Sequence, residues 1–236
     1  MKTGIQAILF DKDGTLLDFD ATWTPAYRSA ALFAAGSDTL ADRLLSATGM
    51  DPVTGKSAAG SLLAAGNTRE IAEAWIDLGC AHRLEQLTLQ LDRIFISAMR
   101  EAVPIAGVPE MLERLEKLGF GLGVASSDSE PSIRAFLEGA GLTARFSFVT
   151  GYDTGFGPKP EPGMVLGFAE AIALDPARIA VIGDNTHDLE MARAAGAGMA
   201  IGVLTGTSRK QDLEALSDTV LESAADLPDY LAHANR

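Results

Sequence analysis

Cysteine is scarce in this chain, since Cys80 is the only one among 236 residues. A lone thiol cannot form a disulfide within the chain, and it cannot supply the several sulfur ligands of a cysteine-based zinc site. Disulfide-stabilised scaffolds and cysteine-built zinc folds are therefore excluded. The composition fits a reducing compartment, so we expect a cytoplasmic protein in which Cys80 is a core thiol.

Basic residues are also few, with 19 Lys and Arg against 32 Asp and Glu and a formal net charge of −13. Such a charge repels the phosphates of nucleic acids and of anionic membranes, and no segment gathers the basic residues on one face. We therefore expect neither nucleic acid nor membrane as a partner. A small anionic substrate is compatible with this charge, because one or two cations in a cleft suffice to bind it.

Long hydrophobic runs are missing too. No run approaches the roughly 18 apolar residues of a membrane-spanning helix, and Asp11 interrupts the first apolar stretch before it reaches the length of a signal peptide. The hydrophobic share is nevertheless 47%, which is typical of a globular chain. The length is about 1.6 times a ~150-residue domain, so the sequence predicts one large domain or a core with a smaller second domain.

The two ends of the chain, residues 1–17 and 101–236, alternate short apolar runs with amphipathic segments. The expected strands lie near residues 5–10, 122–125, 146–149, 179–182 and 199–203, and the expected helices near 108–118, 131–139, 162–173 and 186–195. Strands that alternate with helices imply right-handed crossovers. We therefore predict an α/β fold with a Rossmann-like parallel sheet core and helices on both faces.

Residues 18–100 are helical in pattern, with hardly a strand. Apolar residues recur at three- and four-residue spacing near residues 25–35, 38–48, 69–78 and 83–102, and residues 50–57 are rich in turn formers. Thr24 followed by Pro25 predicts a helix that begins there, because proline is favoured at the first helical position. We predict an α-helical domain, residues 18–100, inserted into a core made of residues 1–17 and 101–236.

The segment Asp11-Lys12-Asp13-Gly14-Thr15 directly follows the first expected strand. In an extended chain, residues two apart point to the same side, so the carboxylates of Asp11 and Asp13 would share one small volume. When two carboxylates lie so close together, either one of them is protonated or a cation binds between them. Mg²⁺ is such a cation, because it prefers oxygen ligands. A simple acidic turn is the alternative interpretation.

Gly183-Asp184 and Asp188 repeat this pattern after the strand expected at 179–182. Folds of this kind bind ligands outside the carboxyl ends of their strands, so Asp184 is a candidate metal ligand. Asp188 falls in the first turn of the next expected helix, where capping the helix is one role and supporting a ligand from behind is another. We favour the supporting role.

Two further segments place hydroxyl and ammonium groups near this edge. Ser126 and Ser127 follow the strand at 122–125 and precede a helix, where hydroxyls and backbone N–H groups can bind an anion, although helix capping is an alternative role. Lys159 stands between Pro158 and Pro160 in a stiffened loop, an unusual setting for a solvated surface lysine. The functional prediction depends on the combination of these segments.

The combination resembles the haloacid dehalogenase superfamily of phosphoryl-transfer enzymes over nearly the whole chain outside residues 18–100. The matching motifs are, in order, Asp11-Lys12-Asp13-Gly14-Thr15-Leu16, Ser126 after its strand, Lys159 within Lys-Pro-Glu-Pro, and Gly183-Asp184 with Asp188. Two later segments, Gly183–Gly196 and Gly202–Gly206, are similar to the phosphoglycolate phosphatase group in particular.

The resemblance implies covalent catalysis. Asp11 would attack phosphorus to give an aspartyl phosphate, which water then hydrolyses. Asp13 would protonate the leaving oxygen and later activate the water, so it must alternate between its protonated and ionised forms. Because dehalogenases of the superfamily lack the second acidic residue of this motif, the presence of Asp13 indicates an oxygen leaving group.

The resemblance also implies the binding groups. Mg²⁺ would be held by Asp11, the backbone carbonyl of Asp13, and Asp184. The phosphoryl oxygens would be contacted by Ser126 and Lys159, with Ser127 beside them and Asp188 in support. Residues 18–100 would form a cap that closes over the site and contacts the leaving group.

The substrate is expected to be a small phosphorylated metabolite, with phosphoglycolate as the leading candidate by resemblance. A phosphosugar mutase of the β-phosphoglucomutase type retains the same four motifs and is the alternative. A protein that binds phosphorylated ligands or a partner without turnover comes third. A phosphonoacetaldehyde hydrolase would need a Schiff-base lysine in the cap, for which Lys56 is the sole candidate.

Within residues 18–100, no cap motif identifies the groups that contact the substrate. The candidates are Arg28, Arg43, Lys56, Asn67 and Arg69, each of which is more often a solvated residue. Trp23 and Tyr27 lie four residues apart, a spacing typical of a packing pair on one helix face.

Overall fold

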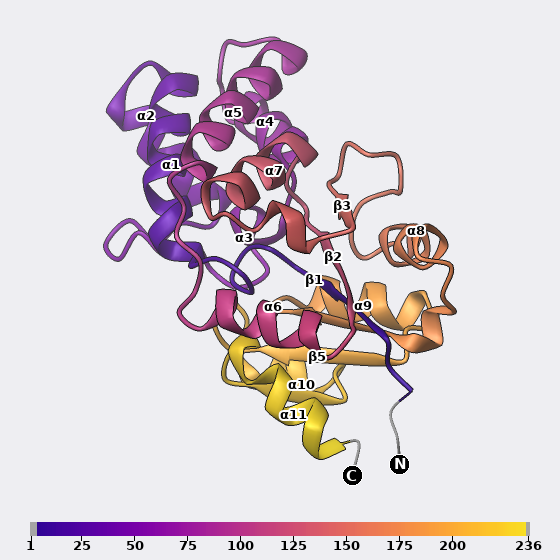
Figure 1. Cartoon of the computed structure of the whole chain (residues 1–236). Helices are drawn as coiled ribbons and strands as arrows, with labels where there is room; N and C mark the ends of the chain where they lie inside the picture. The colour runs from indigo at the N-terminus through magenta and orange to yellow at the C-terminus, as the bar shows by residue number, and fades with distance from the viewer. Residues whose placement is uncertain (1–3, 235–236) are drawn as a thin grey trace.

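The computed structural model describes residues 4–234 and shows a six-stranded parallel sheet surrounded by helices (Figure 1). The strands are β1 (Ala7–Phe10), β2 (Gly121–Ala125), β3 (Phe148–Thr150), β4 (Ile179–Gly183), β5 (Met199–Val203) and β6 (Thr219–Leu221). Their order across the sheet is β3-β2-β1-β4-β5-β6, and every neighbouring pair is parallel. The predicted α/β fold is confirmed.

Strand β1 lies in the middle of the sheet and is buried on both faces. Its side chains alternate, so that Ile8 and Phe10 join one apolar cluster while Ala7 and Leu9 join another. All four side chains are inaccessible to solvent. A strand covered on both faces is apolar at every position, which is why this segment stands out in the sequence.

Helices cover both faces of the sheet. Helices α6 (Val108–Lys117), α7 (Glu130–Gly139) and α11 (Leu227–Ala234) contribute to the cluster of Ile8 and Phe10, while α8 (Gly163–Ala171), α9 (Thr186–Ala194) and α10 (Lys210–Glu214) contribute to that of Ala7 and Leu9. Three single 3-10 turns lie at Thr143–Arg145, Pro176–Arg178 and Ala224–Asp226.

The last part of the chain contains elements that the sequence pattern did not indicate, namely β6, α10 and α11. Strand β6 is three residues long, lies at the edge of the sheet, and has only half-buried residues, so it lacks the apolar run that marks the central strands. Strand β3 begins at Phe148, two residues later than the expected 146–149.

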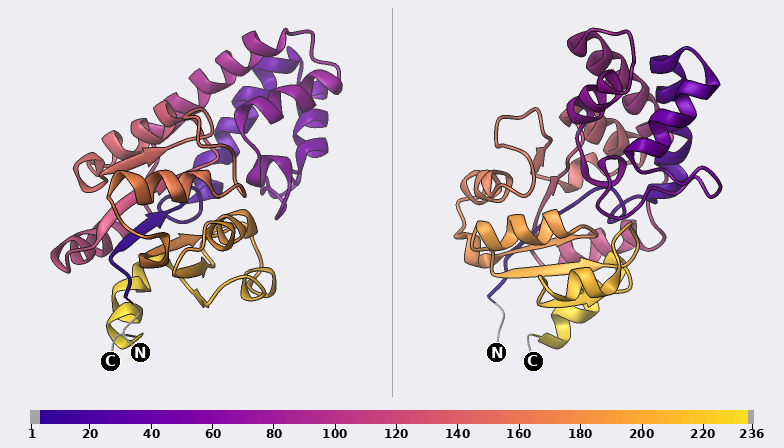
Figure 2. Two further views of the ribbon diagram at one scale, coloured as in Figure 1. Left: turned by 90° about the vertical axis from the view of Figure 1, so that its right-hand side faces the viewer. Right: turned by 180° about the vertical axis from the view of Figure 1, so that it is seen from behind.

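Between β1 and α6, residues 18–100 form five helices, which we call the helical unit. They are α1 (Phe19–Ala35), α2 (Asp38–Thr48), α3 (Leu62–Ala65), α4 (Thr68–Asp77) and α5 (Leu84–Met99). Figures 1 and 2 show them gathered at one end of the molecule, away from the chain termini. Helix α5 also packs against α7, and apolar residues of the unit continue the Phe10 cluster. The domain boundaries themselves remain a prediction.

The start of α1 differs from the expectation. The helix begins at Phe19, capped by the Asp18 carboxylate, which accepts a hydrogen bond from the backbone N–H of Ala21 at 3.0 Å. Pro25 lies inside the helix, so the start expected at Thr24 was wrong. An aspartate cap and the burial of Phe19 and Trp23 favour the earlier start, and they outweigh the hydrogen bond that proline cannot donate.

Among residues 4–234, no helix combines the length and the apolar character needed to cross a membrane.

Candidate active site

Sheet pairing brings the first and fourth motifs together. Strands β1 and β4 are neighbours in register, with Phe10 opposite Ile182, and the backbone N–H of Asp11 donates to the carbonyl of Ile182 at 2.8 Å. Asp11 and Asp184 each follow the last residue of their strand. These strands meet where the strand order reverses, which is the usual ligand-binding crevice of such sheets.

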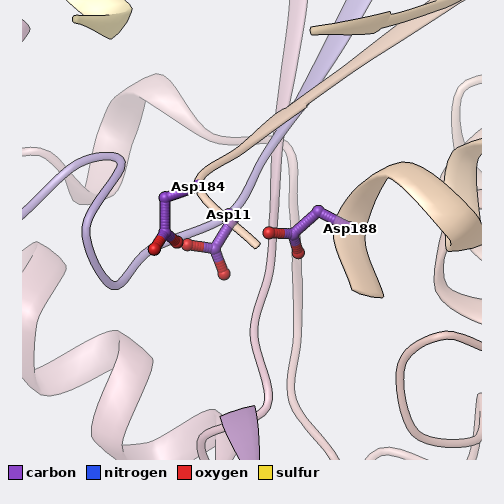
Figure 3. Close-up of side chains that lie close together, drawn as sticks. All are labelled: Asp11, Asp184 and Asp188. Atoms are coloured by element: carbon purple, nitrogen blue, oxygen red, sulfur yellow. The ribbon is translucent and has the colours of Figure 1, made fainter. Parts of the chain in front are cut away.

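Three aspartate carboxylates converge at this crevice. Asp11, Asp184 and Asp188 each offer an oxygen, these oxygens lie within 4.8 Å of one another, and all three residues are buried (Figure 3). Burial and the charges of its neighbours raise the pKa of Asp11 to about 7, although Lys159 opposes the shift. Burial and the carboxylates of Asp11 and Asp188 also raise the pKa of Asp184. The cluster is therefore short of positive charge.

Lys159 joins two of these carboxylates. Its Nζ donates to Asp11 Oδ1 at 2.7 Å and to Asp188 Oδ1 at 2.6 Å. Burial alone would lower the pKa of Lys159, but the two carboxylates outweigh it and raise that pKa above its ordinary value. The other oxygen of Asp188 accepts the backbone N–H of Asn185 at 3.1 Å. Asp188 thus holds Lys159 against Asp11, and its supporting role at the metal site stays a prediction.

The remaining oxygens of the cluster fit a divalent cation. Asp11 Oδ2 is buried and has no hydrogen-bond partner within residues 4–234, while Asp184 Oδ2 accepts only the backbone N–H of Thr207, at 2.8 Å. A buried carboxylate oxygen without a partner is costly unless something else binds it. An all-oxygen donor set is what Mg²⁺ prefers, so the residues present fit this ion.

Two glycines allow the carboxylates to approach the backbone. A Cβ atom at Gly206 would collide with the carboxylate of Asp184, and one at Gly183 would collide with that of Asp188. The hydroxyl of Thr205 donates to the carbonyl of Gly14 at 2.6 Å, which joins the later glycine segment to the first motif. The segment Gly202–Gly206 thus comprises the end of β5 and the start of a loop that lies against Asp184 and the first motif.

Asp13 lies outside the three-carboxylate cluster, although it lines the same cavity. Its Oδ1 accepts hydrogen bonds from Lys12 Nζ at 2.8 Å and from the indole N–H of Trp23 at 2.5 Å. Its Oδ2 accepts the hydroxyl of Ser126 at 3.2 Å. The side chain therefore contacts strand end β2 and helix α1.

The sequence prediction missed Lys12 and Asp128. Lys12 is fully buried and forms ion pairs with Asp13 at 2.8 Å and Asp128 at 3.0 Å. Asp128 also accepts the hydroxyl of Ser132 at 2.5 Å, and burial raises its pKa while Lys12 opposes the shift. A lysine between two aspartates and an aspartate soon after Ser126 were the available signals.

Trp23 has a second role that its spacing could not reveal. It stacks on Tyr27 with ring centroids 5.0 Å apart, which confirms the predicted packing pair. Its N–H also reaches Asp13, and the ammonium of Lys12 lies 5.1 Å from the centre of its ring. Because Trp23 and Asp13 lie in different elements, only the tertiary structure brings them together.

All the predicted site residues of the α/β core line one cavity. They are Asp11, Asp13, Ser126, Ser127, Lys159, Asp184 and Asp188. His187 also lines it. The sheet thus brings every motif of the sequence to one place.

The candidate substrate contacts of the helical unit do not line this cavity. Arg43 donates to the carbonyl of Leu78, Lys56 pairs with Asp20 in an exposed contact at 3.1 Å, and Arg69 pairs with Glu73. Arg28 is exposed. Asn67 alone among the five lines an adjoining cavity. The structure therefore does not bring these side chains to the carboxylates.

Comparison with known proteins identifies the family. The model of the haloacid dehalogenase-like hydrolase family matches residues 5–196. A phosphoglycolate phosphatase of Xylella fastidiosa (strain 9a5c) is 31% identical over 193 residues, which are 81% of this chain and 77% of that protein. The probable phosphatase IndB of Dickeya dadantii (strain 3937) is 42% identical over 115 residues, so that match spans about half of each protein.

A solved structure shows the same fold. The crystal structure of a predicted phosphoglycolate phosphatase from Haemophilus somnus 129PT has a TM-score of 0.74 at 19% sequence identity, over 96% of this chain and 98% of that one. The expected resemblance is confirmed, and the phosphatase names among the relatives support a phosphatase enzyme. The chain belongs to the haloacid dehalogenase-like hydrolase family.

Proposed function

We propose that this protein is a Mg²⁺-dependent phosphomonoester hydrolase that acts through an aspartyl phosphate on a small phosphorylated metabolite. The observation that carries the proposal is the difference between the contacts of the two carboxylate oxygens of Asp11. One of its oxygens contacts Lys159, while the other is buried beside Asp184 without a hydrogen-bond partner among residues 4–234. The family and the names of the relatives support the same chemistry.

Mg²⁺ would be held by Asp11, Asp184 and the backbone carbonyl of Asp13. When bound, the ion supplies positive charge that offsets the crowded carboxylates and the phosphoryl oxygens. Lys159 supplies a second positive charge from the other side of Asp11. Both charges favour the ionised carboxylate of Asp11, which burial alone disfavours.

In the first step an oxygen of Asp11 bonds to phosphorus, and the bond from phosphorus to the ester oxygen breaks. Asp13 donates its proton to that leaving oxygen, so an alcohol departs. Ser126 and Lys159 contact the phosphoryl oxygens, with Ser127 beside them in the same cavity. In the second step Asp13 takes a proton from water, the water oxygen bonds to phosphorus, and inorganic phosphate leaves Asp11.

The helical unit would act as the cap of this site. Helix α1 contributes Phe19 and Trp23 to the cavity wall, and the contact of Trp23 with Asp13 joins the unit directly to the proposed acid. Closure of such a unit excludes bulk water while the phosphoryl group is transferred. Phosphoglycolate is the candidate substrate that the relatives' names supply.

The direct test is phosphate release from p-nitrophenyl phosphate with and without Mg²⁺. We expect release that requires Mg²⁺, is abolished by a chelator, and is lost in Asp11→Asn. Wild-type enzyme quenched during turnover should carry phosphate in a linkage that hydroxylamine cleaves, as an acyl phosphate requires. Full activity of Asp11→Asn would contradict the assignment of the nucleophile.

The same preparation also tests the alternatives. Isomerisation of a hexose phosphate, primed by a bisphosphate and without net phosphate release, would favour a phosphosugar mutase. Binding of phosphate esters without either reaction would favour a non-catalytic protein. The cytoplasmic location and the absence of nucleic-acid partners remain predictions from the sequence.

A further inference from the structure

The part of the cavity that receives the leaving group can be located from Asp13. In the proposed reaction Asp13 protonates the ester oxygen, so the alcohol lies within hydrogen-bonding reach of this carboxylate. Asp13 is held against Trp23 of helix α1 by a hydrogen bond of 2.5 Å. The alcohol therefore meets the wall that the helical unit contributes, which we call the cap wall.

The cap wall is apolar and largely aromatic. Its large side chains are Phe19, Trp23, Tyr27, Leu63, Ile71 and Phe95, all of which line the cavity. The rings of Trp23 and Phe95 meet edge to face with centroids 5.0 Å apart, which fixes the position of both. Burial of the apolar groups of a ligand against such a surface is favourable, because it removes them from water.

The polar atoms of the aromatic side chains are already engaged. The indole N–H of Trp23 donates to Asp13, and the hydroxyl of Tyr27 donates to the carbonyl of Leu63 at 2.7 Å. Thr68 supplies the one hydroxyl that the cap wall has besides that of Tyr27, among the lining residues that the structure describes. Several hydroxyls of a sugar would therefore lose their hydrogen bonds to water without replacement on this wall.

The charge around the cavity disfavours a second anionic group. Five aspartates line the cavity, and Lys159 is the one Lys or Arg among its described lining residues. Lys159 is already paired with Asp11 and Asp188. The adjoining cavity adds Glu70 and, within the described chain, no further Lys or Arg. His187 lines both cavities and is the one other basic side chain there.

We propose that this enzyme is built for phosphomonoesters of uncharged, largely apolar alcohols, and that esters whose alcohol carries a carboxylate are poor substrates. This inference rests on the proposed function. It places phosphoglycolate, the candidate that the relatives supply, below an uncharged ester of similar size. The reason is that its carboxylate would face an apolar wall and a cluster of aspartates without a free cation.

Matched substrate pairs test the proposal. Benzyl phosphate is compared with 4-carboxybenzyl phosphate, and 2-hydroxyethyl phosphate with phosphoglycolate, by kcat/KM at fixed Mg²⁺ concentration. We expect the uncharged ester of each pair to be at least about tenfold better. An ionised carboxylate next to the ester carbon does not improve the leaving group, so each kcat/KM is divided by the rate constant of uncatalysed hydrolysis of the same ester, which removes the difference in intrinsic reactivity.

A separate comparison tests the expected preference for apolar alcohols over alcohols rich in hydroxyls. Glucose 6-phosphate is uncharged outside its phosphate but rich in hydroxyls, and we expect it to be at least about tenfold poorer than benzyl phosphate. Glucose 6-phosphate equal to or better than benzyl phosphate would overturn the apolar assignment. Carboxylated esters equal to or better than their uncharged partners would overturn the charge assignment.

A charge placed on the cap wall gives an independent test. Ala64 is partly exposed and lines the cavity, so Ala64→Lys adds a cation there without filling the core, and Ala64→Gln adds a neutral chain of similar length. We expect Ala64→Lys to narrow the preference for the uncharged ester severalfold, while Ala64→Gln does not. Val53→Lys, at a site 90% exposed and outside both cavities, should leave the preference unchanged.

The outcomes separate this inference from the function on which it rests. If no ester, p-nitrophenyl phosphate included, releases phosphate with Mg²⁺, the proposed function fails. If esters are hydrolysed and the carboxylated member of each pair is equal or better, the function stands and the inference fails. If Ala64→Lys and Ala64→Gln change the preference equally, charge is not the selecting property and the inference also fails.

Discussion

The two sides of the active-site cavity differ in chemical character. The sheet side carries Asp11, Lys159 and Asp184, which are ionisable, buried and placed by strand ends or a loop beside them. The helical unit contributes an apolar wall with Trp23 and Phe95 at its centre. Under the proposed function, the sheet side would react with the phosphoryl group and the helical unit would bind the alcohol. Mutations on the two sides should therefore change different kinetic constants.

The largest effect is expected on the sheet side, from Asp11→Asn. The amide keeps the volume of the side chain but cannot attack phosphorus, so kcat should fall by about 10⁴-fold or more. Steady-state hydrolysis of p-nitrophenyl phosphate measures this loss, and circular dichroism with thermal unfolding checks that the fold is retained. A loss of activity accompanied by unfolding would not count as support.

Asp184→Asn should act on the metal instead. The variant keeps the hydrogen bond from Thr207 to the side-chain oxygen but removes one negative charge from the proposed Mg²⁺ site. We expect the Mg²⁺ concentration needed for half-maximal rate to rise at least about 10- to 100-fold, because the loss of even an outer partner of a metal ligand commonly costs that much affinity. Raising Mg²⁺ should restore part of the rate. A variant with an unchanged Mg²⁺ requirement would remove Asp184 from the metal site.

Trp23→Phe tests the hydrogen bond between the helical unit and Asp13. The phenyl ring keeps the apolar wall but cannot donate to Asp13, so kcat should fall about tenfold as the proposed acid loses a fixed partner. Trp75→Phe is the matched control, because it also removes an indole hydrogen bond of the helical unit, to the hydroxyl of Thr48 at 3.3 Å. The control should lose more than about 1 kcal/mol of stability, because the smaller ring also leaves a cavity at this fully buried position, and it should lose little kcat. Equal loss of kcat in both variants would refute a specific role for Trp23.

The smallest effect concerns Asp92 of α5. Burial raises the pKa of its carboxyl group from 3.8 to about 6, and the hydroxyls of Thr68 and Tyr152 oppose this shift. The folded state therefore binds this proton more tightly than the unfolded state does. The stability that this bound proton contributes to the folded state is fully present below about pH 4 and is lost as the pH rises through about 6.

Asp92→Asn should remove this dependence. Because Asp92 is only partly buried, the variant should be more stable than wild type by about 1 kcal/mol at pH 7.5 and equal to it near pH 4. Urea unfolding midpoints at the two pH values measure the difference. A variant that is less stable at pH 7.5 would show that the ionised carboxylate is stabilised in the folded protein.

The sheet side was largely predictable because it follows local rules. A strand buried on both faces is a run of apolar residues, and the polar residue that ends it marks the ligand edge of a parallel sheet. Asp11, Ser126 and Asp184 could therefore be placed from their positions after such runs. Strand β6 escaped the same rule because a short edge strand needs no apolar run.

The cap wall was not predictable in the same way. Trp23 and Phe95 lie in different helices, and the same spacing of apolar residues is found in any amphipathic helix. The cationic candidates of this region, such as Arg43 and Lys56, contact surface groups instead. Pro25 shows the same limit, since burial of Phe19 and Trp23 overrode a local signal for the start of α1.

The sequence by itself determined the kind of sheet and the family resemblance, and it predicted a set of reacting groups, because strand periodicity and motif order are properties of the chain. Only the tertiary structure decided which oxygen of Asp11 lies without a partner in the described chain, that Trp23 contacts Asp13, and that the helical unit gives the cavity an apolar wall. These features arise from contacts between segments distant in sequence, and packing of whole elements sets such contacts.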